Sequence, residues 1–171
     1  MKKLLTISGT IFVALSGIIA VGILFMHFAV QRVVMDGPSM EPTLHKRQVL
    51  TIKPYRSNKL PMPGEVIEFK SSNKLVKQYA TSEKLIKRII ALPGERVVIA
   101  GGDVRVINPR HLDGLNPDAG YPAAKVITSG TVDITLGEDQ YFVLGDNRPE
   151  SLDSRAIGPV LLQDIIGKVQ L

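Results

Sequence analysis

The chain has 171 residues, enough for one domain of ordinary size plus a small appendage, which argues against two large globular units. It has no cysteine and only three scattered histidines, so disulfides and the common zinc, haem and iron–sulfur patterns are missing, and we expect no metal and no cofactor. The net charge of +5 falls to about +2 beyond residue 35, where 18 basic residues stand against 16 acidic ones, so nucleic acid is not an expected partner.

The first predicted element is an apolar N-terminal segment. Residues 4–30 contain no Asp, Glu, Lys or Arg and a single ionisable side chain, His27. As a helix rising about 1.5 Å per residue, this segment would be about 40 Å long, enough to cross a hydrocarbon core of about 30 Å. A cleaved secretory signal is the alternative, but its apolar core is usually only about 7–15 residues long. We therefore expect residues 1–31 to form a transmembrane anchor.

The charges beside this segment predict its orientation. Lys2 and Lys3 precede it, and Arg32 follows it. Basic residues favour the cytoplasmic side, so we expect a cytoplasmic N-terminus. The sequence thus predicts a single-pass protein of the cell membrane, in contact with lipid, whose residues 32–171 form a domain on the outer face.

The rest of the chain consists of short runs rich in Val and Ile, separated by Gly, Pro, Asn or Asp. This pattern is typical of a mainly antiparallel β domain with little helix. Residues 108–124, rich in Asn, Asp, Gly and Pro, are predicted to be an exposed loop or insertion. Strands are expected at 48–53, 65–70, 74–80, 84–91, 95–100, 103–107, 131–136, 140–144 and 165–171.

Three segments combine turn-forming residues with side chains capable of catalysis: 36–45 (DGPSMEPTLH), 87–95 (KRIIALPGE) and 145–155 (GDNRPESLDSR). Each alone has an ordinary structural explanation as a turn, as solvated strand residues or as a loop staple. Together they offer Ser39 as a nucleophile and Lys87 as its base. A serine hydroxyl needs an adjacent base, and lysine can serve only when burial lowers its pKa well below about 10.4.

The strand that carries Lys87 is apolar, and its side chains alternate between two faces. One of Lys87 and Arg88 should therefore point into the protein, although alternation alone permits either. A Ser-His-Asp triad is the competing arrangement, with Ser39 and either His45 or His111. Neither histidine lies in a strong local motif, and His111 falls in the predicted exposed loop.

In order and spacing, these segments resemble the sequence boxes of bacterial type I signal peptidases, which remove signal peptides from exported proteins. Residues 39–44 (SMEPTL) are similar to the nucleophile box, 64–67 (GEVI) to a short strand box, 87–95 to the lysine box and 145–155 to the last box. The resemblance implies the antiparallel β domain of this family and a membrane-bound serine endopeptidase. Its substrates would be preproteins with small residues at the first and third positions before the cut.

The resemblance also assigns roles to residues. It makes Ser39 the nucleophile, Lys87 the general base and Ser151 the residue that hydrogen-bonds and orients the lysine. A supporting charged cluster would hold the walls of the site together, namely Asp146, Arg148, Asp153 and Arg155. Substrate and oxyanion would meet Gly37, Pro38, Ser39 and Met40, with the Ser39 backbone N–H as one oxyanion donor.

Position 37 departs from part of the family. Some members place a serine there as a second oxyanion donor, so Gly37 leaves that donor open and resembles the Gram-positive branch. The short chain is similar to a minimal form. Lysine rather than histidine at position 87 argues against the branch of the endoplasmic reticulum and archaea.

Two other functions are considered. One is a membrane-tethered domain that keeps the peptidase fold but acts as an assembly partner or chaperone, for example in pilus construction. The presence of both Ser39 and Lys87 argues against it. The other is a self-cleaving regulator with Ser–Lys chemistry, but an apolar segment stands where its DNA-binding domain would be. The sequence does not specify which preproteins are cut, or whether the enzyme serves all exported proteins or only a few.

Overall fold

The computed structural model describes residues 15–19, 22, 31–55, 59–119 and 127–171. The chain divides into two units, Met1–Gln31 and Arg32–Leu171. In the first unit, residues 15–19 and 22 are helical, and most of the predicted anchor lies outside the described residues. Among the residues described, no helix is both long and apolar enough to cross a membrane.

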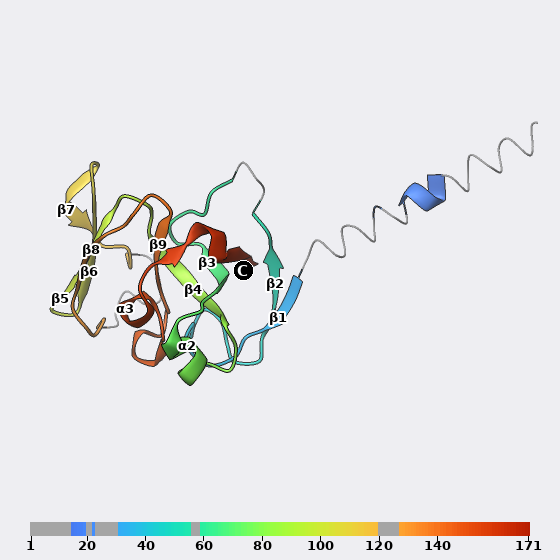
Figure 1. The fold of residues 1–171 in the computed structure, drawn as a ribbon, viewed down its shortest axis with the longest axis horizontal. Helices are drawn as coiled ribbons and strands as arrows, with labels where there is room; N and C mark the ends of the chain where they lie inside the picture. Colours follow the sequence, from blue (N-terminus) through green and yellow to red (C-terminus); the bar gives the residue numbers. More distant parts are fainter. Residues whose placement is uncertain (1–14, 20–21, 23–30, 56–58, 120–126) are drawn as a thin grey trace, which may run out of the picture. The chain divides into compact units, whose positions relative to one another are not determined.

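The second unit is built from two β-sheets (Figure 1). The larger sheet has the strand order β1-β2-β11-β3-β4-β9-β10, and the smaller sheet has the order β7-β6-β5-β8. The strands are β1 (Gln31–Val34), β2 (Val49–Lys53), β3 (Val66–Lys70), β4 (Lys84–Ala91), β5 (Arg96–Ala100), β6 (Asp103–Asn108), β7 (His111–Leu115), β8 (Val132–Thr135), β9 (Gln140–Leu144), β10 (Val160–Leu161) and β11 (Ile165–Gln170). In the larger sheet, all neighbouring strands from β2 to β10 pair antiparallel. The neighbouring strands of the smaller sheet are antiparallel as well.

The prediction of a mainly antiparallel β domain is confirmed, and eight predicted strands match observed strands to within one residue at each end. Alternation explains this success. In β6, Val104 and Val106 are buried while Asp103 and Arg105 are exposed, so the period of two in the sequence is also the period of burial.

The described part of the second unit contains four short helical elements. They are α2 (Lys74–Tyr79), η2 (Arg148–Glu150), α3 (Ser154–Ile157) and η3 (Leu162–Asp164). The strand predicted at 74–80 is wrong, because α2 occupies it. The Asn73 side chain accepts a hydrogen bond from the Leu75 backbone N–H at 2.9 Å, an N-cap that starts the helix. Val76 is the buried residue that fixes α2 to the domain.

The predicted exposed loop at 108–124 is wrong in part. Residues 111–115 form β7, which pairs with β6, and Asp118 is buried. Residues 120–124 of this stretch lie outside the described part of the chain. The predicted strands also omitted β1 and the two-residue β10, which have too few residues for a recognisable alternation.

Strand β4 is the central element for the site. It lies between β3 and β9, and every residue from Ile86 to Ala91 is buried. Lys87 and Arg88 are only 3% and 4% exposed. The sequence predicted that one of the two points inward, and the structure buries both. Both are buried because both faces of β4 are covered, whereas the alternation argument requires only one covered face.

Candidate active site

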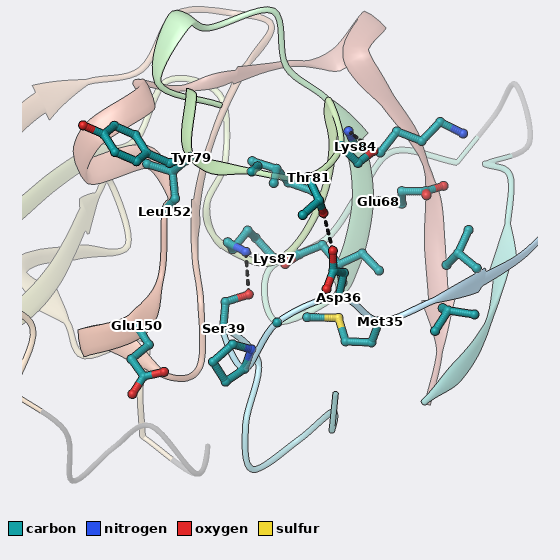
Figure 2. Close-up of a pocket in the computed structure, with 18 residues that line it drawn as sticks. Met35, Asp36, Ser39, Glu68, Tyr79, Thr81, Lys84, Lys87, Glu150 and Leu152 are labelled. Carbon is teal, nitrogen blue, oxygen red and sulfur yellow. Dashed lines mark hydrogen bonds between the residues drawn. The ribbon is translucent and has the colours of Figure 1, made fainter. Parts of the chain in front are cut away.

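Ser39 and Lys87 lie next to each other in the second unit. The Lys87 Nζ atom is 2.8 Å from Ser39 Oγ and also donates a hydrogen bond to the Ile86 carbonyl oxygen at 2.9 Å (Figure 2). Ser39 is half-buried in the segment after β1, and Lys87 is in the middle of β4. Two residues 48 positions apart are therefore in hydrogen-bond contact.

The segment that carries Ser39 is held by contacts on both sides. The Asn147 backbone N–H donates to the Ser39 carbonyl at 3.1 Å, and Asn147 Nδ2 donates to the Pro38 carbonyl at 3.2 Å. Met40, the next residue, is fully buried in a core cluster that also contains Leu44 and Ile86. These contacts fix the backbone, so the hydroxyl position is set by the fold rather than by a local turn.

Burial changes the chemistry of Lys87. Desolvation lowers the pKa of its ammonium group from 10.5 to about 8, although the charges of Asp153 and Asp146 act in the opposite direction. The neutral amine is therefore a minority form near pH 7, but it is far more populated than in a lysine with an ordinary pKa. A neutral amine within 2.8 Å of a serine hydroxyl can accept its proton.

Ser151 lies close to this pair, but without the contact that the resemblance implies. Its Oγ atom is buried and has no hydrogen-bond partner in the described part of the chain, Lys87 included. Gly145 brings the segments together, because a Cβ atom there would lie 2.5 Å from the Ser39 carbonyl oxygen and 2.6 Å from Ser151 Cβ. Only glycine permits so close an approach.

Asp146 is paired with Arg88, a residue to which the sequence analysis gave no supporting role. Arg88 donates to both carboxylate oxygens, at 2.8 and 2.5 Å, and also to the Gly64 carbonyl at 2.7 Å. Thr43 Oγ1 donates to Asp146 at 2.5 Å. This network joins the segment after Ser39, strand β4 and the loop after β9. The one feature of the sequence that could have identified Arg88 is its position directly after Lys87.

The other members of the predicted charged cluster form two further pairs. Asp153 pairs with Arg155 at 2.8 Å and accepts a hydrogen bond from the Gly145 N–H at 3.0 Å. Arg148 pairs with the buried carboxylate of Asp118 and donates to Thr128 Oγ1 at 2.5 Å. Nothing in the sequence marked Asp118, because it lies 30 residues from its partner and in a stretch that reads as a loop.

A groove of about 520 Å³ runs past the Ser39–Lys87 pair. It is lined by residues 33–39, 79–82 and 84–87 together with Glu68, Glu150 and Leu152 (Figure 2). Gly37 and Pro38 are among the predicted substrate-binding residues that line it. Met40 does not line it, and its side chain is 0% exposed in the core.

The histidines of the competing triad are elsewhere. His45 and His111 are both exposed, and neither lines the groove. Within the described ranges, no group of three His, Cys, Asp or Glu side chains is suited to a metal ion. Ser39 therefore has a lysine as its basic neighbour and not a histidine.

Comparisons with known proteins show the family to which the chain belongs. Residues 7–171 match the family described as signal peptidase, peptidase S26. Signal peptidase I of Bacillus amyloliquefaciens is 31% identical over 80% of this chain and 71% of its own length. A probable signal peptidase I-2 of Synechocystis is 37% identical over 88% of this chain and 65% of its own length. A crystal structure of a signal peptidase I from Enterococcus faecalis superposes with a TM-score of 0.50 at 27% identity, covering 67% of this chain and all of that one. The chain therefore belongs to the signal peptidase family, peptidase S26.

Proposed function

We propose that the protein is a membrane-bound serine endopeptidase that removes signal peptides from exported preproteins, with Ser39 as nucleophile and Lys87 as general base. Its membership of peptidase family S26 identifies it as a hydrolase. The observation that carries the assignment of residues is the 2.8 Å contact between Lys87 Nζ and Ser39 Oγ, made where the lysine is 3% exposed.

The chemistry follows from this pair. Neutral Lys87 accepts the hydroxyl proton as Ser39 Oγ attacks the scissile carbonyl carbon, and the tetrahedral intermediate collapses when the resulting ammonium protonates the leaving amine. Lys87, neutral again, then accepts a proton from the water that attacks the ester, and its ammonium returns that proton to Ser39 Oγ as the acyl–oxygen bond breaks. The carbonyl of Ile86 accepts a hydrogen bond from Nζ and orients the amine between these steps.

The oxyanion that forms during both steps needs backbone donors. The Ser39 N–H makes no hydrogen bond with the residues that the structure describes, so it is available to the developing negative charge. Gly37 lines the same groove with a positive φ of 84°, a conformation in which glycine is favoured.

The proposal includes the membrane. Residues 1–31 would anchor the protein and residues 32–171 would form the catalytic domain on the outer face. The eight residues between Val30 and Ser39 let these two residues lie at most about 30 Å apart, so an anchored Ser39 stays close to the lipid surface. Signal peptides end at that surface, which places their cleavage sites within reach. We further propose small residues at the first and third positions before the cut.

The experiment is cleavage of a labelled preprotein in detergent by the full chain, with the cut site read by mass spectrometry. Wild type should cut after a small-x-small sequence, while Ser39→Ala and Lys87→Ala should not. Exposed Ser72→Ala and Lys77→Ala serve as matched controls and should cut normally. Equal cutting by all five proteins would contradict the proposed roles. No cutting by any folded protein would favour the assembly-partner function instead.

A further inference from the structure

The acidic residue Glu68 of β3 has no role in the chemistry described above. It is 2% exposed, and its Oε2 atom is buried with no hydrogen-bond partner among the residues described. It nevertheless lines the groove that contains Ser39 and Lys87. A buried carboxylate oxygen normally has a donor, because the water it has lost must be replaced. The groove therefore presents an acceptor whose donor must come from elsewhere.

Glu68 lies beside the strand that carries the general base. It is paired with Ile86, the residue immediately before Lys87, in the antiparallel β3–β4 ladder. Figure 2 draws Glu68 and Lys84 on one side of Asp36, and Ser39 on the other. A peptide lying along the groove with its scissile bond at Ser39 would thus extend past Asp36 toward Glu68.

The charges of the groove favour a cation. Its acidic lining residues are Asp36, Glu68 and Glu150, and its basic ones are Lys84 and Lys87. Lys87 must be neutral to act as a base, which leaves three carboxylates and one ammonium group. Burial raises the pKa of Glu68, and the charge of Lys84 only partly opposes this, so the carboxylate is short of positive neighbours.

We propose that the groove binds a lysine or arginine side chain of the substrate, located within a few residues before the cut, with Glu68 as its partner. The inference rests on the proposed function and deepens it by adding a basic side chain to the small residues expected at the cut. A long basic side chain can lay its apolar stem against groove residues such as Met35 and Ile86 while its charged end reaches the carboxylate. A short apolar side chain would leave Oε2 unpaired.

A hydrogen bond between two other residues that line the groove can open when a substrate enters. Asp36 and Thr81 both line the groove, and the Thr81 hydroxyl donates a hydrogen bond to the Asp36 carboxylate. Both residues are exposed, so water can replace this bond at little net cost when a substrate side chain enters.

The test uses one parent preprotein that carries Ala-x-Ala before the cut. Lys, Met or Glu is placed singly at the second, fourth, fifth and sixth positions before the cut, so that both small residues are kept, and kcat/KM is measured with the full chain in detergent. Met has a similar length without the charge. At one position, wild type should cleave the Lys substrate about tenfold more efficiently than the Met substrate, and the Glu substrate less efficiently than either.

Two variants then identify the residue responsible. With Glu68→Gln, the ratio of kcat/KM for the Lys substrate to kcat/KM for the Met substrate at that position should fall to about one. Glu83→Gln removes an exposed carboxylate that borders β4 outside the groove, and should leave the ratio unchanged.

Each failure has its own signature. Equal rates for Lys and Met at every position in wild type would overturn the inference, and this comparison does not depend on any variant folding. A Lys preference undiminished in folded Glu68→Gln would also overturn it. In both cases, cleavage of the parent would leave the proposed function standing. No cleavage of the parent by wild type would contradict the proposed function, and the inference with it.

Discussion

Arg88 donates two hydrogen bonds to Asp146, from Nε at 2.8 Å and from Nη2 at 2.5 Å, immediately beside the residue proposed as general base. Both side chains are almost fully buried, at 5% and 1% exposed. The bidentate contact ties β4 to the loop after β9, so the position of Lys87 depends on an ion pair of its neighbour.

Breaking this pair should destabilise the domain strongly. Asp146→Ala leaves the Arg88 guanidinium buried without its carboxylate, and we expect a loss of about 3–5 kcal/mol in the free energy of unfolding, measured by chemical denaturation. Arg96→Ala breaks a similarly bidentate pair with Asp133, but on the exposed surface, and should leave the denaturation midpoint nearly unchanged. A comparable loss of unfolding free energy in both variants would show that burial does not determine how much the Arg88–Asp146 pair stabilises the domain.

The activity should depend on pH through Lys87. The lysine acts as a base only when neutral, and burial lowers its pKa to about 8, so kcat/KM should rise as pH increases through about 8. The measurement is a pH profile of kcat/KM between pH 6 and 10. A rate that falls across this range, or one that rises only near the ordinary lysine pKa of about 10.4, would contradict the role of Lys87.

The same lysine should cost stability below about pH 10.5, and the full cost should be present below about pH 8. Its pKa is lower in the folded chain, about 8, than its ordinary value of 10.5. Between these values the unfolded chain binds more protons, so the stability of wild type rises with pH. Lys87→Met should therefore be more stable than wild type at pH 7, by about 3 kcal/mol, and this advantage should shrink as pH approaches 10.5. Chemical denaturation at several pH values measures the difference, and a constant difference would contradict it.

Gly145 should be intolerant of a side chain. An added Cβ would lie 2.5 Å from the Ser39 carbonyl oxygen, so Gly145→Ala must displace either the nucleophile segment or Ser151. We expect kcat/KM to fall by about 10²-fold, because small misplacements of a catalytic group are costly. Gly137→Ala is the control, since its nearest neighbour would be the side chain of Gln140, which can move. Normal activity of folded Gly145→Ala would show that this close approach does not position Ser39.

Local patterns in the sequence determined much of this protein. Alternating Val and Ile residues specify where strands form, because a strand with one covered face repeats every two residues. The motifs around Ser39, Lys87 and Asp146 specified the family and the candidate nucleophile and base. These features are readable because each depends on residues that are close together in the chain.

Other features were decided by the tertiary structure. The sequence pattern at 74–80 fits a strand, but an Asn73 cap and the burial of Val76 make it a helix. Arg88 and Lys87 are buried together because β4 has neighbours on both edges and cover on both faces. The Arg148–Asp118 pair and the unpartnered carboxylate of Glu68 depend on contacts between distant segments. Such contacts form only when separate elements pack, and no periodicity or local motif encodes which distant residue a side chain will meet.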